Sequence, residues 1–124
     1  MFSINLRSRV AIYEQIVAQV EDGILKGLLK ADEQLPSVRM LSLELALNPN
    51  TVSRAYTELE RRGIIYSVVG KGSFVSENAQ RIIAQKYSQT FSDFYEQVKN
   101  YRAAGIPKKE LIDMIEKIYR MEEN

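Results

Sequence analysis

The 124-residue chain contains no cysteine and no histidine, and each absence excludes a class of chemistry. Without cysteine there is no disulfide and no thiolate metal site, which fits a reducing compartment such as the cytoplasm. Without histidine the chain lacks the commonest general base and the commonest ligand of transition metals. A zinc site or a Ser-His-Asp triad cannot be built from this chain alone, so we expect no metal, no cofactor and no enzyme.

The sequence also lacks a long hydrophobic run and a large excess of either charge. No apolar run approaches the ~18 residues of a membrane span. The opening residues "MFSINLRSRV" lack the apolar centre of a signal peptide, so we expect no membrane partner. The net charge is only +1 with acids and bases well mixed. A case for nucleic-acid binding must therefore rest on where individual charges lie.

Three short helices are predicted in the first half of the chain, after an arm over residues 1–9. Apolar residues recur every four positions from Ile12 to Ile24, and Gly27 is a plausible stop for this first helix. Ser37 is a suitable N-cap for a second helix, which carries its apolar residues at helical spacing. Those residues are Val38, Leu41 and Leu45.

The third helix begins at "NPNTVSRAY", where Asn48 is a good N-cap and Pro49 occupies the first helical position. We expect it to run to Arg62 and to stop at Gly63. The segment "GIIYSVVGKGSFVSE" then gives two runs of β-forming residues around a Gly-Lys-Gly turn, which predicts a hairpin. The short connection between the second and third helices is typical of a helix-turn-helix, and the hairpin would be its wing. We place this winged helix-turn-helix at residues 1–76.

Residues 77–124 are predicted to form a tail of two antiparallel helices. Apolar residues at spacings of four and three make one seam along a long helix that Gly105 ends, and Pro107 fits the start of a last helix. The short Gly-Pro connection makes the two helices antiparallel neighbours. The expected fold class is therefore α+β, mostly helical: a winged helix-turn-helix followed by a two-helix tail.

The third helix has two faces of different character. Val52, Ala55, Tyr56 and Leu59 must pack inward, whereas the opposite face carries only polar side chains and no acid. Those side chains are Asn50, Thr51, Ser53, Arg54 and Thr57. An acid-free face at the positive end of a helix suits a polyanion, and these side chain types bond base edges and phosphates. The alternative is an ordinary solvated surface helix.

Two further features point the same way. Arg39 lies in the first turn of the second helix, where a cation opposes the helix dipole and does not serve stability. We interpret it as a phosphate or guanine contact; the alternative is a harmless surface arginine. Gly70-Lys71-Gly72 forms the hairpin tip, either as a plain turn or as a wing whose backbone and lysine reach a minor groove or phosphate.

The seam of the tail is too long for one short partner helix to cover, because a helix of about 25 residues is about 38 Å long. We therefore expect a homodimer interface there. The alternatives are an intramolecular core and a small-ligand pocket between the tail helices. The expected interface residues are Ile83, Tyr87, Phe91, Phe94, Val98, Tyr101, Leu111, Ile115 and Ile118.

The segments "YEQIVAQVEDGILKGLL", "LPSVRMLSLELALNPNTVSRAYTELERRGII" and "GKGSFVS" resemble the GntR family of bacterial transcription regulators, from about Ile12 to Ser76. The short tail resembles the YtrA subfamily. The resemblance implies a cytoplasmic homodimeric repressor. It also implies that DNA is contacted by Arg39, by the wing around Gly72, and by the third helix through Asn50, Thr51 and Ser53 or Arg54. Pro49 and Ser53 stand where many relatives have arginine, so the base readout of those relatives does not transfer.

The leading hypothesis is a sequence-specific repressor that binds a pseudo-palindromic DNA operator as a homodimer, with an unidentified small-molecule effector compatible with that role. The alternative hypothesis is a winged helix that binds another protein and not DNA. The candidate DNA-binding residues are Ser37, Arg39, Asn50, Thr51, Ser53, Arg54, Thr57, Gly70, Lys71 and Gly72.

Overall fold

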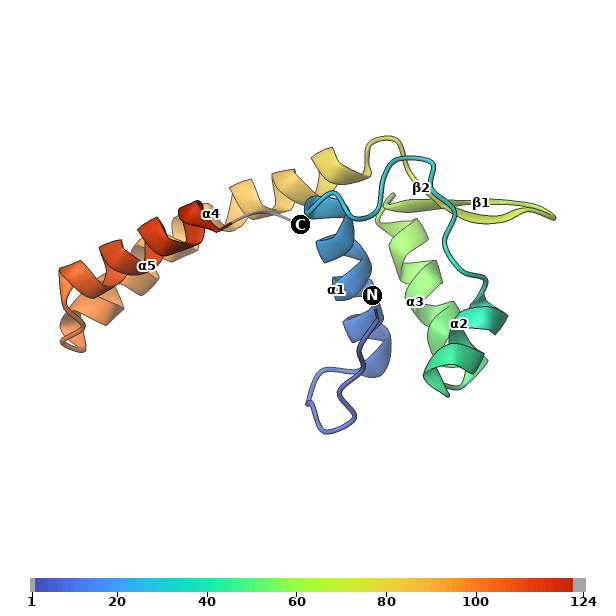
Figure 1. Ribbon diagram of the computed structural model, residues 1–124, viewed down its shortest axis with the longest axis horizontal. Coiled ribbons are helices and arrows are strands. Elements are labelled where there is room, and N and C mark those ends of the chain that lie inside the picture. Colours follow the sequence, from blue (N-terminus) through green and yellow to red (C-terminus); the bar gives the residue numbers. More distant parts are fainter. Residues whose placement is uncertain (1, 122–124) are drawn as a thin grey trace. The chain divides into compact units, whose positions relative to one another are not determined.

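The computed structural model describes residues 2–121, and within that range it contains five helices and one β-hairpin (Figure 1). Three helices and the hairpin come first, and two helices follow. This confirms the predicted fold class and order of elements. The chain divides into two compact units, residues 1–84 and 85–124.

Helices α1 (Ile12–Leu25), α2 (Val38–Leu45) and α3 (Pro49–Arg61) enclose the core of the first unit. Figure 1 shows α3 beside both α1 and α2. The face of α3 that was predicted to pack inward is buried along its whole length. Its core residues are Val52, Ala55, Tyr56 and Leu59, which pack with Ile16, Val20 and Leu41.

Local side chains determine where α2 and α3 begin. The Ser37 hydroxyl accepts a hydrogen bond from the Met40 amide, and the Asn48 side chain accepts one of 2.8 Å from the Asn50 amide, so both predicted caps are confirmed. Between the helices, Ala46 adopts a left-handed φ of 54°. The third helix ends at Arg61, one position before the predicted end, and Gly63 beyond it has a φ of 79°.

The hairpin pairs β1 (Ile65–Val68) with β2 (Gly72–Val75), which confirms the predicted hairpin. The segment before α2 also pairs with β2 through its backbone. The Leu35 amide donates to the Ser73 carbonyl, and the Asp32 amide donates to the Val75 carbonyl. The wing is therefore attached to the residues that lead directly into α2.

Helix α4 (Ala79–Ala103) starts in the first unit and continues into the second. Ala79 and Ile83 are buried in the core of the winged helix, so the first unit extends beyond residue 76. This corrects the expectation that Ile83 lies in a dimer interface, because its side chain is only 2% exposed. Its apolar neighbours along the seam are accessible, but Ile83 itself fills the core.

The second unit pairs the rest of α4 with α5 (Lys108–Arg120) across a turn in which Gly105 has a φ of 90°. No side chain between residues 85 and 121 is buried. The helices of this unit thus share an apolar surface without enclosing a core. Across residues 2–121, none of the helices combines the length and the apolar composition that crossing a membrane requires.

Tyr56 connects α3 to the segment before α2 and provides a test of the core. Its hydroxyl donates a 2.6 Å hydrogen bond to the Pro36 carbonyl, and burial raises the pKa of Tyr56 to about 12. Because the raised pKa favours the neutral form in the folded state, this stabilisation is complete below about pH 10. It is lost as the pH rises from about 10 to 12, by about 2–3 kcal/mol in total.

We expect Tyr56→Phe to unfold with a shallower loss of stability between pH 10 and 12 than the wild type, as measured by urea denaturation at each pH. At neutral pH the variant should be about 1 kcal/mol less stable, because the Pro36 carbonyl loses its donor. Other tyrosines and the lysines titrate in both proteins and cancel in the comparison. Parallel pH curves for the two proteins would contradict this role of Tyr56.

Candidate nucleic-acid interface

The outward face of α3 gathers the polar side chains that the sequence singled out. Asn50, Ser53, Arg54 and Thr57 are exposed, and Thr51 is half-buried at the N-terminal end. The first turn contains no acid. Since the opposite face is buried in the core, this face is held in a fixed orientation and presents donors and acceptors at the positive end of the helix.

Arg54 does not extend freely from this face. Its guanidinium carbon lies 3.9 Å from the centre of the Tyr13 ring, so the cation stacks on an aromatic side chain of α1. With Thr57, Glu58 and Arg61, these two residues line a shallow hollow of about 240 Å³. The stack places Arg54 at the edge of the face that is nearest to α1. Tyr13 was not among the expected site residues, and its only sequence signal was its position at the start of α1.

The neighbouring Arg61 and Arg62 are engaged in ion pairs with α1 and α3. Arg61 Nε lies 2.9 Å from a Glu58 oxygen, and Arg62 lies 3.2 Å from Glu21 on α1. The hydrogen bond from Arg61 lowers the pKa of the Glu58 carboxyl. Both cations are therefore partly neutralised, and the pair between Arg62 and Glu21 joins the end of α3 to α1.

Arg39 is exposed on α2 and forms no ion pair with any residue between 2 and 121. The first turn of α2 carries no acid that could form an ion pair with the Arg39 guanidinium. Ser37, just before it, uses its oxygen to cap the helix, which leaves its hydroxyl proton available to a ligand. Both residues lie where the sequence placed them, at the start of the helix that precedes the α2–α3 turn.

The wing tip depends on a residue that the sequence did not single out. The Gln34 side chain donates a 2.7 Å hydrogen bond to the Lys71 carbonyl, and Gln34 also pairs with Phe74 through the backbone. Gly72 has a φ of 125°, and a Cβ atom there would lie 2.8 Å from the Gln34 Nε2 atom. The positive φ thus favours glycine at 72, and a Cβ atom there would displace the Gln34 amide that holds the turn.

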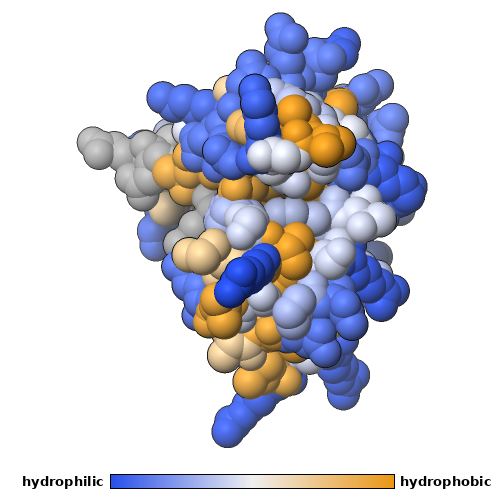
Figure 2. All heavy atoms as spheres, turned by 90° about the vertical axis from the view of Figure 1, so that its right-hand side faces the viewer, coloured by the Kyte–Doolittle hydropathy of each residue, from blue (hydrophilic) through white to orange (hydrophobic). Residues whose placement is uncertain are grey.

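Hydrophobic side chains accompany the charged ones on this side of the molecule. Val69 at the wing tip is fully exposed, and Met40 and Leu43 on α2 are 62% and 69% exposed. Figure 2, which faces the side where the hairpin ends, shows hydrophobic groups standing between hydrophilic ones. The surface is therefore of mixed character, with single apolar groups among polar side chains.

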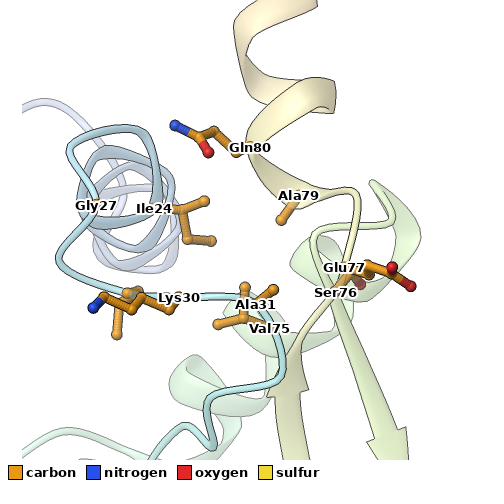
Figure 3. Close-up of a pocket in the computed structure, with 10 residues that line it drawn as sticks. Ile24, Gly27, Lys30, Ala31, Val75, Ser76, Glu77, Ala79 and Gln80 are labelled. Carbon is orange, nitrogen blue, oxygen red and sulfur yellow. The ribbon is translucent and has the colours of Figure 1, made fainter.

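A separate cavity of about 190 Å³ lies in the first unit, where α1 ends and α4 begins. Its walls are of mixed character, with apolar side chains from Ile24, Leu29 and Val75 and polar ones from Lys30 and Gln80. In Figure 3 the Gln80 amide extends toward α1, whereas the Glu77 carboxylate points away. Within residues 2–121, no buried side-chain polar atom lacks a partner, and no group of three potential metal ligands occurs. We assign no ligand to this cavity.

Comparison with known proteins gives one consistent result. Residues 12–75 match the family model described as bacterial regulatory proteins, gntR family. The HTH-type transcriptional repressor YtrA of Bacillus subtilis is 40% identical over 119 residues, which cover 95% of this chain and 92% of that protein. The similarity to this protein therefore includes the tail as well as the winged helix.

Solved structures agree over nearly the whole chain. A crystal structure named as a transcriptional antiterminator from Listeria monocytogenes has a TM-score of 0.74 and 33% identity, and the match covers 97% of this chain and 90% of that one. A GntR family transcriptional regulator from the same organism has a TM-score of 0.71 and 34% identity, covering 90% and 98% of the two chains.

The contact between Gln34 and Lys71 can be tested by hydrogen exchange. We expect Gln34→Ala to speed amide exchange at Lys71 and Gly72, because the turn loses the donor that holds its carbonyl. Lys71→Ala is the control, since it removes the side chain but keeps the carbonyl that Gln34 binds. Equal exchange rates in the wild type and in Gln34→Ala would show that the turn holds itself.

Proposed function

The chain belongs to the GntR family of bacterial regulatory proteins, and we propose that it represses transcription by binding a pseudo-palindromic DNA operator as a homodimer. The family model, described as bacterial regulatory proteins, matches residues 12–75, which include the three helices and the hairpin of the winged helix. The single observation that carries the proposal is the polar outward face at the start of α3, whose first turn contains no acid and whose orientation is fixed by the buried face behind it. The repressor role comes from the name of its relative in Bacillus subtilis.

In this proposal, the N-terminal half of α3 enters the major groove. Asn50 and Ser53 are exposed there and carry the hydrogen-bonding groups that read base edges. Thr51 and the backbone at the start of the helix contact phosphate, as helix N-termini do. Arg39 from α2 and Lys71 from the wing bind phosphates on either side, so that the helix is held in register.

The contact with Tyr13 decides which of two roles we propose for Arg54, a base contact or a phosphate contact. Stacking on Tyr13 orients the guanidinium toward the edge of the face that is nearest to α1. Because the stack already restricts the side chain, Arg54 loses less conformational freedom when it binds DNA. A cation held at an edge is better placed for a phosphate than for a base in the middle of the groove. We therefore assign Arg54 to the DNA backbone, together with Thr57 on the same edge.

The homodimer rests on the second unit. With no buried side chain between residues 85 and 121, this unit cannot be stable by itself, because chains of about 40 residues usually need a partner or a covalent staple. Its two helices line an apolar groove of about 610 Å³, which includes Phe94, Val98, Tyr101, Leu111 and Ile115. A second copy of the same helices offers an apolar surface to fill it, with Tyr87, Phe91 and Ile118 extending the contact.

Two consequences follow for the setting of the protein. A regulator of bacterial genes acts in the cytoplasm, where its operator lies, and it needs no catalytic chemistry of its own.

A protein-interaction module remains the second candidate, because Met40 and Leu43 are exposed on α2. The two candidates separate in one experiment. A salt-sensitive complex with the DNA upstream of the chain's own gene supports the regulator, whereas no complex at any salt supports the interaction module.

The cations around the outward face of α3 can be tested by substitution. We expect Arg39→Ala and Arg54→Ala each to weaken operator binding about tenfold or more, with a smaller loss for Lys71→Ala. Each change should flatten the slope of log affinity against log salt by about 2 in a dimer, because one phosphate contact is lost per protomer. Lys26→Ala removes an exposed cation at the C-terminal end of α1, where it pairs with Asp22, and should bind as the wild type does. Full-strength binding by the Arg39, Arg54 double variant would refute these roles.

The proposed dimer interface can be tested by placing a charge in it. We expect Phe91→Asp or Phe94→Asp to give monomers by light scattering and to lose most operator affinity, because a desolvated carboxylate would destabilise the interface. Ser92→Asp adds the same charge to an adjacent exposed position of α4 and should stay dimeric. A Phe94→Asp protein that remains a dimer and binds fully would place the interface elsewhere.

A further inference from the structure

Two glutamines of α1 hold the N-terminal arm in a defined path. The Gln19 amide donates to the Ser3 carbonyl and accepts from the Ser3 amide at 2.8 Å. One turn earlier, the Gln15 amide does the same with Asn5, accepting at 2.9 Å and donating at 3.0 Å. Ser3 and Asn5, every second residue of the arm, each exchange two hydrogen bonds with a glutamine side chain of α1. This is the spacing at which an extended segment pairs with a neighbouring strand.

The side chains on either side of Ser3 attach the arm to the core. Phe2 and Ile4 are partly buried against the core of the first unit, and Phe2 lines a cavity with Leu29 and Leu35. Beyond Asn5 the chain turns, with the Asn5 side chain accepting from the Arg7 amide at 3.0 Å. The Gln15 amide also donates to the Val10 carbonyl at 3.0 Å, so both ends of the turn are fixed to one side chain.

This turn presents two arginines to solvent. Arg7 and Arg9 are exposed, and neither forms an ion pair with any residue in the part of the chain that the structure describes. The first acid of the sequence is Glu14, so no carboxylate in the arm compensates them. A rigid turn that displays two unpaired cations has no evident role in the core, since the anchoring is done by other residues.

The turn stands close to the DNA face of α3. Tyr13, in the first turn of α1, stacks on Arg54, which brings the start of α1 to the edge of that face. Figure 1 shows the loop before α1 at the same end of the first unit as the α2–α3 turn. Arg7, Arg9 and Arg54 thus continue the positive charge beyond α3, on the side away from the wing.

We propose that the clamped turn at residues 5–10 is a second DNA-binding element, in which Arg7 and Arg9 bind backbone phosphates that flank the base pairs contacted by α3. Gln15 and Gln19 are positioning residues, because they fix the turn and do not touch the DNA. The inference rests on the proposed function and deepens it. It predicts an operator footprint longer than the α3 contacts require, with no added sequence preference, since phosphates carry no base identity.

The test compares salt-dependent affinities for operator DNA. We expect the Arg7→Ala, Arg9→Ala double variant to bind roughly tenfold or more weakly at about 0.1 M salt. The slope of log affinity against log salt should flatten by about 4, because the dimer loses four phosphate contacts. The Lys26→Ala, Lys30→Ala double variant removes the same charge from the far end of α1 and should bind as the wild type does. Thermal melting of each variant checks that the first unit is folded.

Two further measurements separate contact from structure. On operator DNA trimmed of its flanking base pairs, the wild type and the Arg7, Arg9 double variant should bind equally. Gln15→Ala with Gln19→Ala keeps both arginines but frees the arm, and should lower affinity with little change in the salt slope. An unchanged slope for the arginine variant on long DNA would overturn the inference, whereas a wild type that binds no DNA would refute the proposed function itself.

Discussion

The burial of one face of α3 is the constraint on which the rest of the first unit depends. Val52, Ala55 and Leu59 have no exposed surface, and Tyr56 is nearly as buried. A helix packed in this way cannot rotate about its axis without breaking the core. The polar face opposite is therefore fixed in space, and the short α2–α3 turn and the wing are arranged around it.

Side-chain amides also fix the position of two segments that have no regular secondary structure. Gln34 holds the wing tip through the Lys71 carbonyl, and Gln15 and Gln19 hold the arm through paired backbone groups. A glutamine amide carries both a donor and an acceptor, so it can take the place of a peptide group where no strand is available. The elements that we assign to DNA contact are thus attached to the three-helix core at both sides.

The two units meet the demand for apolar burial in different ways. The winged helix encloses its own core, which includes Ala79 and Ile83 at the start of α4. The tail has the same kind of apolar periodicity but leaves it accessible, and we propose that a second copy covers it. The same apolar spacing along α4 therefore first places side chains in the core of the winged helix and then leaves them accessible on the tail. The change occurs between Ile83, which is buried, and Tyr87, which is exposed.

The sequence by itself determined the elements, the two helix caps, the inward face of α3 and the family, because helical periodicity, capping residues and motif order are local properties of a chain. It placed Ile83 in an interface, since a seam has the same spacing whether the surface it meets is the chain's own core or another molecule. Tertiary structure alone decided that Ile83 is core, that Arg54 stacks on Tyr13, and that Gln34, Gln15 and Gln19 hold distant backbone. The contacts of Gln15 with Asn5, of Gln34 with Lys71 and of Arg54 with Tyr13 join residues that lie 10, 37 and 41 positions apart in the chain. The sequence shows the chemistry of each side chain, but only the fold determines which distant residue it contacts.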